Sequence, residues 1–124
     1  MRHLCYNREK SAGREIMSAR VMYVVNIRIA IKHEKEFNHW HDKEHIPRVL
    51  AQPGFIQVRK FRCIKNDSKE AEYFVLYELQ NQEAYDRYVK SEEGAKLRQE
   101  FLDFYGGRTK VTRLAWHETL RLMK

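Results

Sequence analysis

The stretch WHDKEHIPRVLAQPGF, residues Trp40–Phe55, decides the fold of this chain. Its first part belongs to a segment, about residues 34–51, that is rich in helix formers and contains no glycine. Four side chains in this region fall on one side of a helix at helical spacing: Phe37, Trp40, His41 and Glu44. Pro47 lacks an N–H and disfavours helical geometry at the preceding residue, so we expect a kink or a fresh helical turn there. Pro53-Gly54 predicts a turn, and Phe55 begins a strand.

The residues on either side of this stretch predict four strands and a second helical region. Alternating or continuous apolar patterns indicate strands at residues 21–31, 55–64, 72–79 and 109–122. Asn81 is the expected N-cap of a helix. Ser91 is expected to cap a continuation of this helix, which ends at Gly106-Gly107. The element order βαββαβ predicts an α+β, ferredoxin-like fold, in which two helices cover one face of an antiparallel four-stranded sheet.

The strand at residues 72–79, EYFVLYEL, is apolar on both of its faces and is therefore expected near the centre of the sheet. Two helices can cover only one face. An uncovered apolar face is typical of an interface. We therefore expect a homodimer that closes through the sheet face, and neither nucleic acid nor membrane as a partner.

Length and composition suit one domain with a real core. The chain has 124 residues, of which 43% are hydrophobic, and a formal net charge of +7. We expect residues 1–20, which are rich in arginine, to be a disordered extension, or translated upstream sequence with the native start at Met17 or Met22, and residues 21–124 to form the domain. No run of about 18 apolar residues is present, and Cys5 and Cys63 are interpreted as reduced thiols of a cytoplasmic protein.

The pattern W-H-D-K-E-H-I-P followed by P-G-F resembles the EthD-like branch of the dimeric α/β-barrel superfamily and the related antibiotic-biosynthesis monooxygenase-type proteins. The matching positions are Phe37, Trp40, His41, Glu44, His45, Ile46, Pro47, Pro53, Gly54 and Phe55. The element order extends the resemblance over about residues 21–122. It implies a dimeric α/β-barrel that binds a small molecule and acts as a cofactor-independent monooxygenase or isomerase-like enzyme on an apolar or aromatic substrate. A non-catalytic ligand-binding or auxiliary protein is the alternative.

The chemistry implied by this resemblance needs a base, an apolar pocket and hydrogen-bond donors for an anion. His45 and His41 are the candidate catalytic bases, because imidazole titrates near neutral pH. Candidate substrate-binding residues are Trp40 and Trp116 as apolar walls, and Asn26, Arg59 and Tyr77 as donors if they face the cavity. In the structural alternative, one histidine braces the break at Pro47, the other is exposed, and both tryptophans belong to the core.

Two rival interpretations use the same residues or the same element order. Residues His41–His45 spell H-x-x-E-H, an inverted zinc-protease motif, but Pro47 interrupts the helix where such a site needs rigidity, so we expect no metal and no cofactor. The RNA-recognition motif is also βαββαβ. Residues Glu70–Tyr77 keep only the end of its third-strand signature and place acidic residues where a phosphate backbone would lie.

Overall fold

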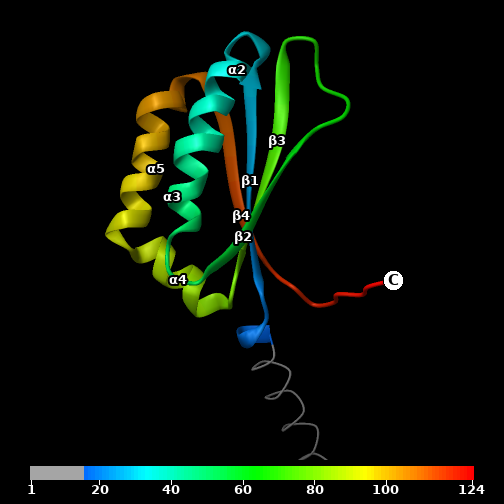
Figure 1. The fold of residues 1–124 in the computed structure, drawn as a ribbon, viewed down its shortest axis with the longest axis vertical. Helices are drawn as coiled ribbons and strands as arrows, with labels where there is room; N and C mark the ends of the chain where they lie inside the picture. Colours follow the sequence, from blue (N-terminus) through cyan, green and yellow to red (C-terminus); the bar gives the residue numbers. More distant parts are fainter. Residues whose placement is uncertain (1–15) are drawn as a thin grey trace, which may run out of the picture.

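The computed structural model describes residues 16–124, which form an α+β fold in the expected βαββαβ order (Figure 1). The elements in chain order are β1 (Val21–Ala30), α2 (Ile31–Trp40), the π-helical turn η1 (His41–His45), α3 (Ile46–Leu50), β2 (Phe55–Arg62), β3 (Glu70–Leu79), α4 (Gln82–Lys90), α5 (Glu92–Tyr105), the 3₁₀ turn η2 (Gly106–Arg108) and β4 (Thr109–His117). The last strand is shorter than expected, because residues 118–124 continue as coil. Most of the extension predicted at residues 1–20, including Cys5, lies outside the described residues.

The four strands form one antiparallel sheet, as predicted, and their order in the sheet is β2-β3-β1-β4. The expected central position of β3 is confirmed, and β1 is its central neighbour, with Tyr23 opposite Tyr77. Helices α2, α3, α4 and α5 lie against one face of the sheet, and within residues 21–124 the other face carries no helix (Figure 1). Every second residue of β1, from Val21 to Ile29, is buried toward the helices. The period-two pattern therefore directs one row of side chains into the core.

The segment after β1 is helical from Ile31, three residues earlier than predicted, because the strand passes into α2 without a loop. Four of its buried side chains recur at every fourth position, namely Phe37, His41, His45 and Val49, and Ile46 is buried beside this row. A regular α-helix has 3.6 residues per turn, so a row spaced by four would rotate out of the core. The wider π turn, in which the N–H of Ile46 donates to the carbonyl of His41, keeps the row facing inward.

The prediction that Glu44 lies on the same side of the helix as Phe37, Trp40 and His41 is wrong, and the π turn is the reason. Glu44 is exposed, because the wider turn brings His45 to the inward side instead. Pro47 lies at the start of α3, directly after η1. A proline ring clashes with the carbonyl four residues earlier in a regular helix, and a local wide turn relieves that clash. The predicted break at Pro47 is thus confirmed and takes the form of a π turn.

Gly54, in the predicted Pro53-Gly54 turn, fixes where β2 starts relative to α4. Its φ is 86°, and a Cβ at this position would lie 2.4 Å from the Cβ of Ala84. Only glycine adopts this backbone without strain and permits so close an approach.

Both predicted N-caps are confirmed, since the side chains of Asn81 and Ser91 accept hydrogen bonds from the backbone three residues ahead.

Candidate functional site

A small cavity lies between the helix-facing side of the sheet and the helices. Its lining residues are Tyr23, Val25, His41, His45, Val49, Tyr77, Tyr88, Arg98, Phe101 and Arg113. Its volume is about 20 Å³, which is room for about one water molecule. All of the lining is buried except Arg98 and Arg113, which are partly exposed. A larger ligand therefore needs side chains to move, and these two arginines are the ones next to solvent.

His45 is buried in this lining without a hydrogen bond. Neither ring nitrogen has a hydrogen-bond partner within residues 16–124, and Nδ1 is fully buried. The ring stacks on Trp40 at 4.9 Å between centroids and meets the edge of Phe101 at 5.5 Å. Burial lowers the pKa of His45 to about 4, assisted by the charges of Arg48 and Arg113 and opposed by Glu100. At neutral pH the imidazole is therefore uncharged and can accept a proton.

His41 is also buried, but its Nδ1 is engaged. The Lys60 ammonium donates to Nδ1 over 3.0 Å, to Oδ1 of Asn38 over 2.8 Å and to Oδ1 of Asp42 over 2.7 Å. These three acceptors match the three donors of an ammonium group, so Nδ1 of His41 is the acceptor nitrogen. Burial, the Lys60 charge and His45 lower the pKa of His41 to about 2. Because both histidines are buried, the expected alternative in which one of them is exposed is wrong.

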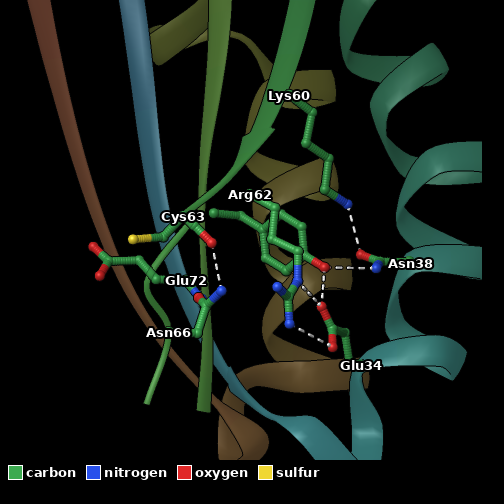
Figure 2. A network of polar contacts seen from close by, with 8 residues as sticks. Glu34, Asn38, Lys60, Arg62, Cys63, Asn66 and Glu72 are labelled. Carbon is green, nitrogen blue, oxygen red and sulfur yellow. Dashed lines mark hydrogen bonds and ion pairs between the residues drawn. The ribbon is translucent and has the colours of Figure 1, made fainter. Parts of the chain in front are cut away.

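Lys60 belongs to a polar network that joins β2 and β3 to α2 (Figure 2). Glu34 of α2 accepts hydrogen bonds from the Tyr73 hydroxyl and from the Arg62 guanidinium. Asn38 donates to the Tyr73 hydroxyl over 2.9 Å and accepts from Lys60. Hydrogen bonds from Arg62 and Tyr73 lower the pKa of Glu34, against the effect of burial. The network thus holds α2, and with it His41, at a fixed position against the sheet.

Two tyrosines from the central strands complete the polar part of the cavity. Tyr23 and Tyr77 are buried and stack at 5.7 Å between centroids. Within residues 16–124 neither hydroxyl makes a hydrogen bond. Burial raises the pKa of Tyr23 to about 12 and raises that of Tyr77, so both remain protonated donors at neutral pH. Neither hydroxyl oxygen is a fully buried atom, and without a partner in this part of the chain each is free to donate to a bound molecule.

The structure brings only part of the predicted site together. His41, His45 and Tyr77 line the cavity, and Trp40 supports it by stacking on His45. Asn26, Arg59 and Trp116 instead occupy positions on the bare face of the sheet, where Asn26 donates to Glu72 over 2.8 Å and Trp116 is 58% exposed. The alternation of each strand explains the separation, because residues one position apart face opposite sides. Trp116 is likewise not a core residue.

Sequence reasoning missed several residues of the lining, notably Tyr23, Tyr88, Arg98 and Arg113. A signal existed for Arg113. It follows Val111 and precedes Ala115 at period two in β4, so its side chain belongs to the inward row. An arginine at an inward position is unusual for a purely structural core. No comparable signal exists for Arg98, because helix α5 places it beside the cavity only after the chain has folded.

The arrangement gives no support to the H-x-x-E-H interpretation. Glu44 is exposed, and Nδ1 of His41 is bonded to Lys60. Within residues 16–124 no three side chains of His, Cys, Asp or Glu converge to hold a metal ion. In the same part of the chain, none of the helices combines the length and the hydrophobicity that crossing a membrane requires.

Comparison with known proteins places this chain in a family. A family described as a domain of unknown function, DUF4286, matches residues 20–118. The chain belongs to the DUF4286 family. No curated protein matches this DUF4286 chain in sequence.

Solved structures share the fold of this DUF4286 domain at low identity. An EthD-family protein from Bacillus halodurans has a TM-score of 0.62 and 16% identity, over 80% of this chain and 99% of its own. A candidate antibiotic biosynthesis monooxygenase from Bacillus cereus has 0.63 and 14%, over 86% and 99%. SnoaB from Streptomyces nogalater, a cofactor-independent oxygenase, has 0.61 and 13%, over 86% and 99%. The predicted resemblance to EthD-like and monooxygenase-type proteins is therefore confirmed as a likeness of fold.

Proposed function

We propose that this protein binds a small, largely apolar molecule in the cavity between sheet and helices, and that His45 acts on it as a general base. The observation that carries the proposal is the set of unpaired polar groups around the cavity. His45 and the hydroxyls of Tyr23 and Tyr77 lack hydrogen bonds within residues 16–124, although all three side chains are buried. Aromatic rings of Trp40 and Phe101 enclose His45. An apolar pocket with a few converging polar groups is the usual form of a ligand site.

The chemistry that fits this set is proton abstraction followed by stabilisation of the resulting anion. The neutral imidazole of His45 accepts a proton from an acidic C–H or O–H of the substrate, and the tyrosine hydroxyls donate to the electron-rich anion. Return of the proton at another carbon gives an isomerase. Reaction of the anion with dioxygen gives a cofactor-independent oxygenase, which is the activity described for SnoaB, a protein of the same fold.

Exchange of acidic protons with solvent tests this step without knowledge of the natural substrate. 2-Tetralone, an apolar aromatic ketone with acidic C–H groups, is incubated with the protein in D₂O, and deuteration is followed by NMR. We expect His45→Ala to lose the catalysed exchange while the chain stays folded. His39, which is exposed on α2, offers the matched control, and His39→Ala keeps the exchange. Equal exchange by both variants contradicts the proposed role of His45.

A non-catalytic binding protein is the second candidate, and the environment of His45 favours it. Its pKa of about 4 makes it a weak base, because general bases work best with a pKa near the operating pH. No carboxylate within residues 16–124 hydrogen-bonds to the ring to orient it. Native mass spectrometry of the purified protein separates the two candidates. A co-purifying molecule that the protein never converts supports the binder, and one that is converted supports the enzyme.

We also propose that the protein is a homodimer whose two sheets face each other. Phe61, Phe74, Leu114 and Trp116 lie on the bare face, and each is between 48% and 58% exposed. These four residues come from β2, β3 and β4, so the apolar side chains are spread from one edge strand of the sheet to the other. A monomer rarely exposes so many large apolar side chains on one face, and a second copy of the same face is the complementary partner.

Sedimentation at micromolar concentration tests the dimer. We expect Leu114→Glu to produce monomers, because a carboxylate in the centre of an apolar interface is desolvated without a partner. Leu102→Glu is the matched control, since Leu102 is 52% exposed but lies on helix α5, away from the sheet face. A monomeric wild type, or equal effects of the two variants, rules out this interface.

A further inference from the structure

We propose that the ligand of this cavity is a small organic acid, bound as its anion, with the acid group at Arg98 and Arg113 and an apolar body toward His45. This inference rests on the proposed function of the cavity and adds the chemical class of the ligand. The first argument is the charge of the lining. Its ten residues include two arginines, two histidines and no acidic side chain.

Neither arginine is neutralised by the protein. Neither Arg98 nor Arg113 forms an ion pair within residues 16–124. Arg98 donates to the backbone carbonyl of Val89, forms a side-chain hydrogen bond with Tyr88, and lies over the ring of Tyr88 at 5.0 Å. Arg113 lies over the ring of Phe101 at 5.8 Å, facing the core from β4. Two arginines without an ion-pair partner in this part of the chain thus leave positive charge beside the cavity, and a bound anion would offset it.

The acidic residue whose charge reaches the site cannot supply that anion. Glu100 acts on His45 electrostatically, but both of its carboxylate oxygens accept hydrogen bonds from Arg48 at 2.7 Å. The Arg113 charge, in contrast, acts on His45, Tyr23, Tyr77 and Tyr88 at once, because it lowers the pKa of each. Its guanidinium therefore lies within electrostatic reach of His45 and of the three tyrosines of the lining.

The donors around the cavity also match an anion. A guanidinium donates to a carboxylate in a bidentate geometry, and a phenol hydroxyl donates well to a negative oxygen. Tyr23 and Tyr77 offer two such hydroxyls without partners in residues 16–124. Val25, Val49 and Phe101 supply an apolar wall for the remainder of the molecule. A neutral apolar ligand would leave the Arg113 guanidinium and the hydroxyls of Tyr23 and Tyr77 without acceptors.

Matched pairs of acids and amides test the inference on the full chain. The pairs are benzoate with benzamide, phenylacetate with phenylacetamide, and hexanoate with hexanamide. Binding is measured by NMR from the imidazole signals of His45. We expect at least one acid to bind about tenfold more tightly than its amide, the usual gain from a hydrogen bond to a charged group. The bound anion also raises the pKa of His45, because it favours the protonated ring.

Variants of Arg113 locate the charge recognition. Arg113→Met should remove the preference for the acid, and Arg113→Lys should retain part of it. Arg87→Met is the matched control, since Arg87 is exposed on α4 and outside the cavity lining. Amides that bind His45 as tightly as the acids overturn the anion inference and leave the proposed binding function standing. If no acid or amide perturbs the His45 signals, both the proposed binding function and the anion inference are contradicted. If Arg87→Met loses the preference for the acid as fully as Arg113→Met does, the preference arises from net charge and the anion inference is overturned.

Discussion

Acidification should destabilise this protein through His45, and the size of the effect follows from its burial. The side chain is 7% exposed, and its pKa in the folded chain is about 4, against an ordinary value of 6.5. Between these two values the unfolded chain binds a proton that the folded chain excludes. Stability is therefore complete above pH 6.5 and falls as the pH decreases toward 4. At about 1.4 kcal/mol for each pKa unit, the loss attributable to His45 is about 3 kcal/mol.

Replacing His45 with phenylalanine isolates this contribution. The ring of His45 makes stacking contacts with Trp40 and Phe101 and no hydrogen bond within residues 16–124, so a phenylalanine loses only the titration. Urea unfolding at pH 7, 6, 5 and 4, at one protein concentration, measures the free energy of unfolding. We expect the wild type to lose about 3 kcal/mol more than His45→Phe over this range.

The exposed His39 provides the control for this experiment. His39→Gln should follow the wild-type pH dependence, because an exposed imidazole gains and loses its proton equally in both states. Glu34 is present in all three proteins and cancels in the comparison. His41 also cancels, because burial and the Lys60 charge, which the substitution of His45 leaves in place, are the larger causes that keep its pKa below the pH range of the experiment. Parallel stability curves for the wild type and His45→Phe would refute the reasoning that burial keeps His45 neutral.

Three further substitutions test the framework of the site by urea unfolding. Gly54→Ala should cost about 1–3 kcal/mol, since the added Cβ meets Ala84 at a positive φ; an unchanged midpoint contradicts this. Lys60→Met should cost about 1–3 kcal/mol, because it leaves partly buried acceptors unpaired, whereas the exposed Lys110→Met should cost less than about 0.5 kcal/mol; equal losses would count against the network. Asn81→Ala should cost about 1 kcal/mol through loss of the N-cap, and a neutral result would show the cap to be dispensable.

Much of the fold was predictable, because local patterns carry it. The alternation of residues 21–30 and the continuous apolar run at 72–79 gave the two central strands. Asn81 and Ser91 marked helix starts through the chemistry of their side chains. The passage from β1 directly into α2 was not predictable in the same way, since no loop residue separates the elements and tertiary packing decides where the strand ends.

The candidate site was only partly predictable, because it is assembled from distant elements. His41, His45 and Tyr77 were identified from one motif and one strand. Asn26 and Arg59 were chosen for their chemistry, although each is one position away from the inward row of its strand. Arg98 joins the site from α5, and the sequence contains no periodic signal that ties this helix to the cavity. The chemistry of a side chain therefore does not identify a site residue unless the register of the sheet, which decides the face it occupies, is also known.

The two histidines of the W-H-D-K-E-H-I-P motif differ in role although the same π turn buries both. The turn directs His41 toward β2, where Lys60 donates to it and makes it part of the framework. It directs His45 between Trp40 and Phe101, where no donor or acceptor within residues 16–124 reaches the ring. Burial without hydrogen bonds costs stability, and it leaves an uncharged imidazole free to bind a ligand. Of the pair, His45 is thus the side chain for which we propose a ligand, because the fold offers its ring no hydrogen-bond partner within residues 16–124.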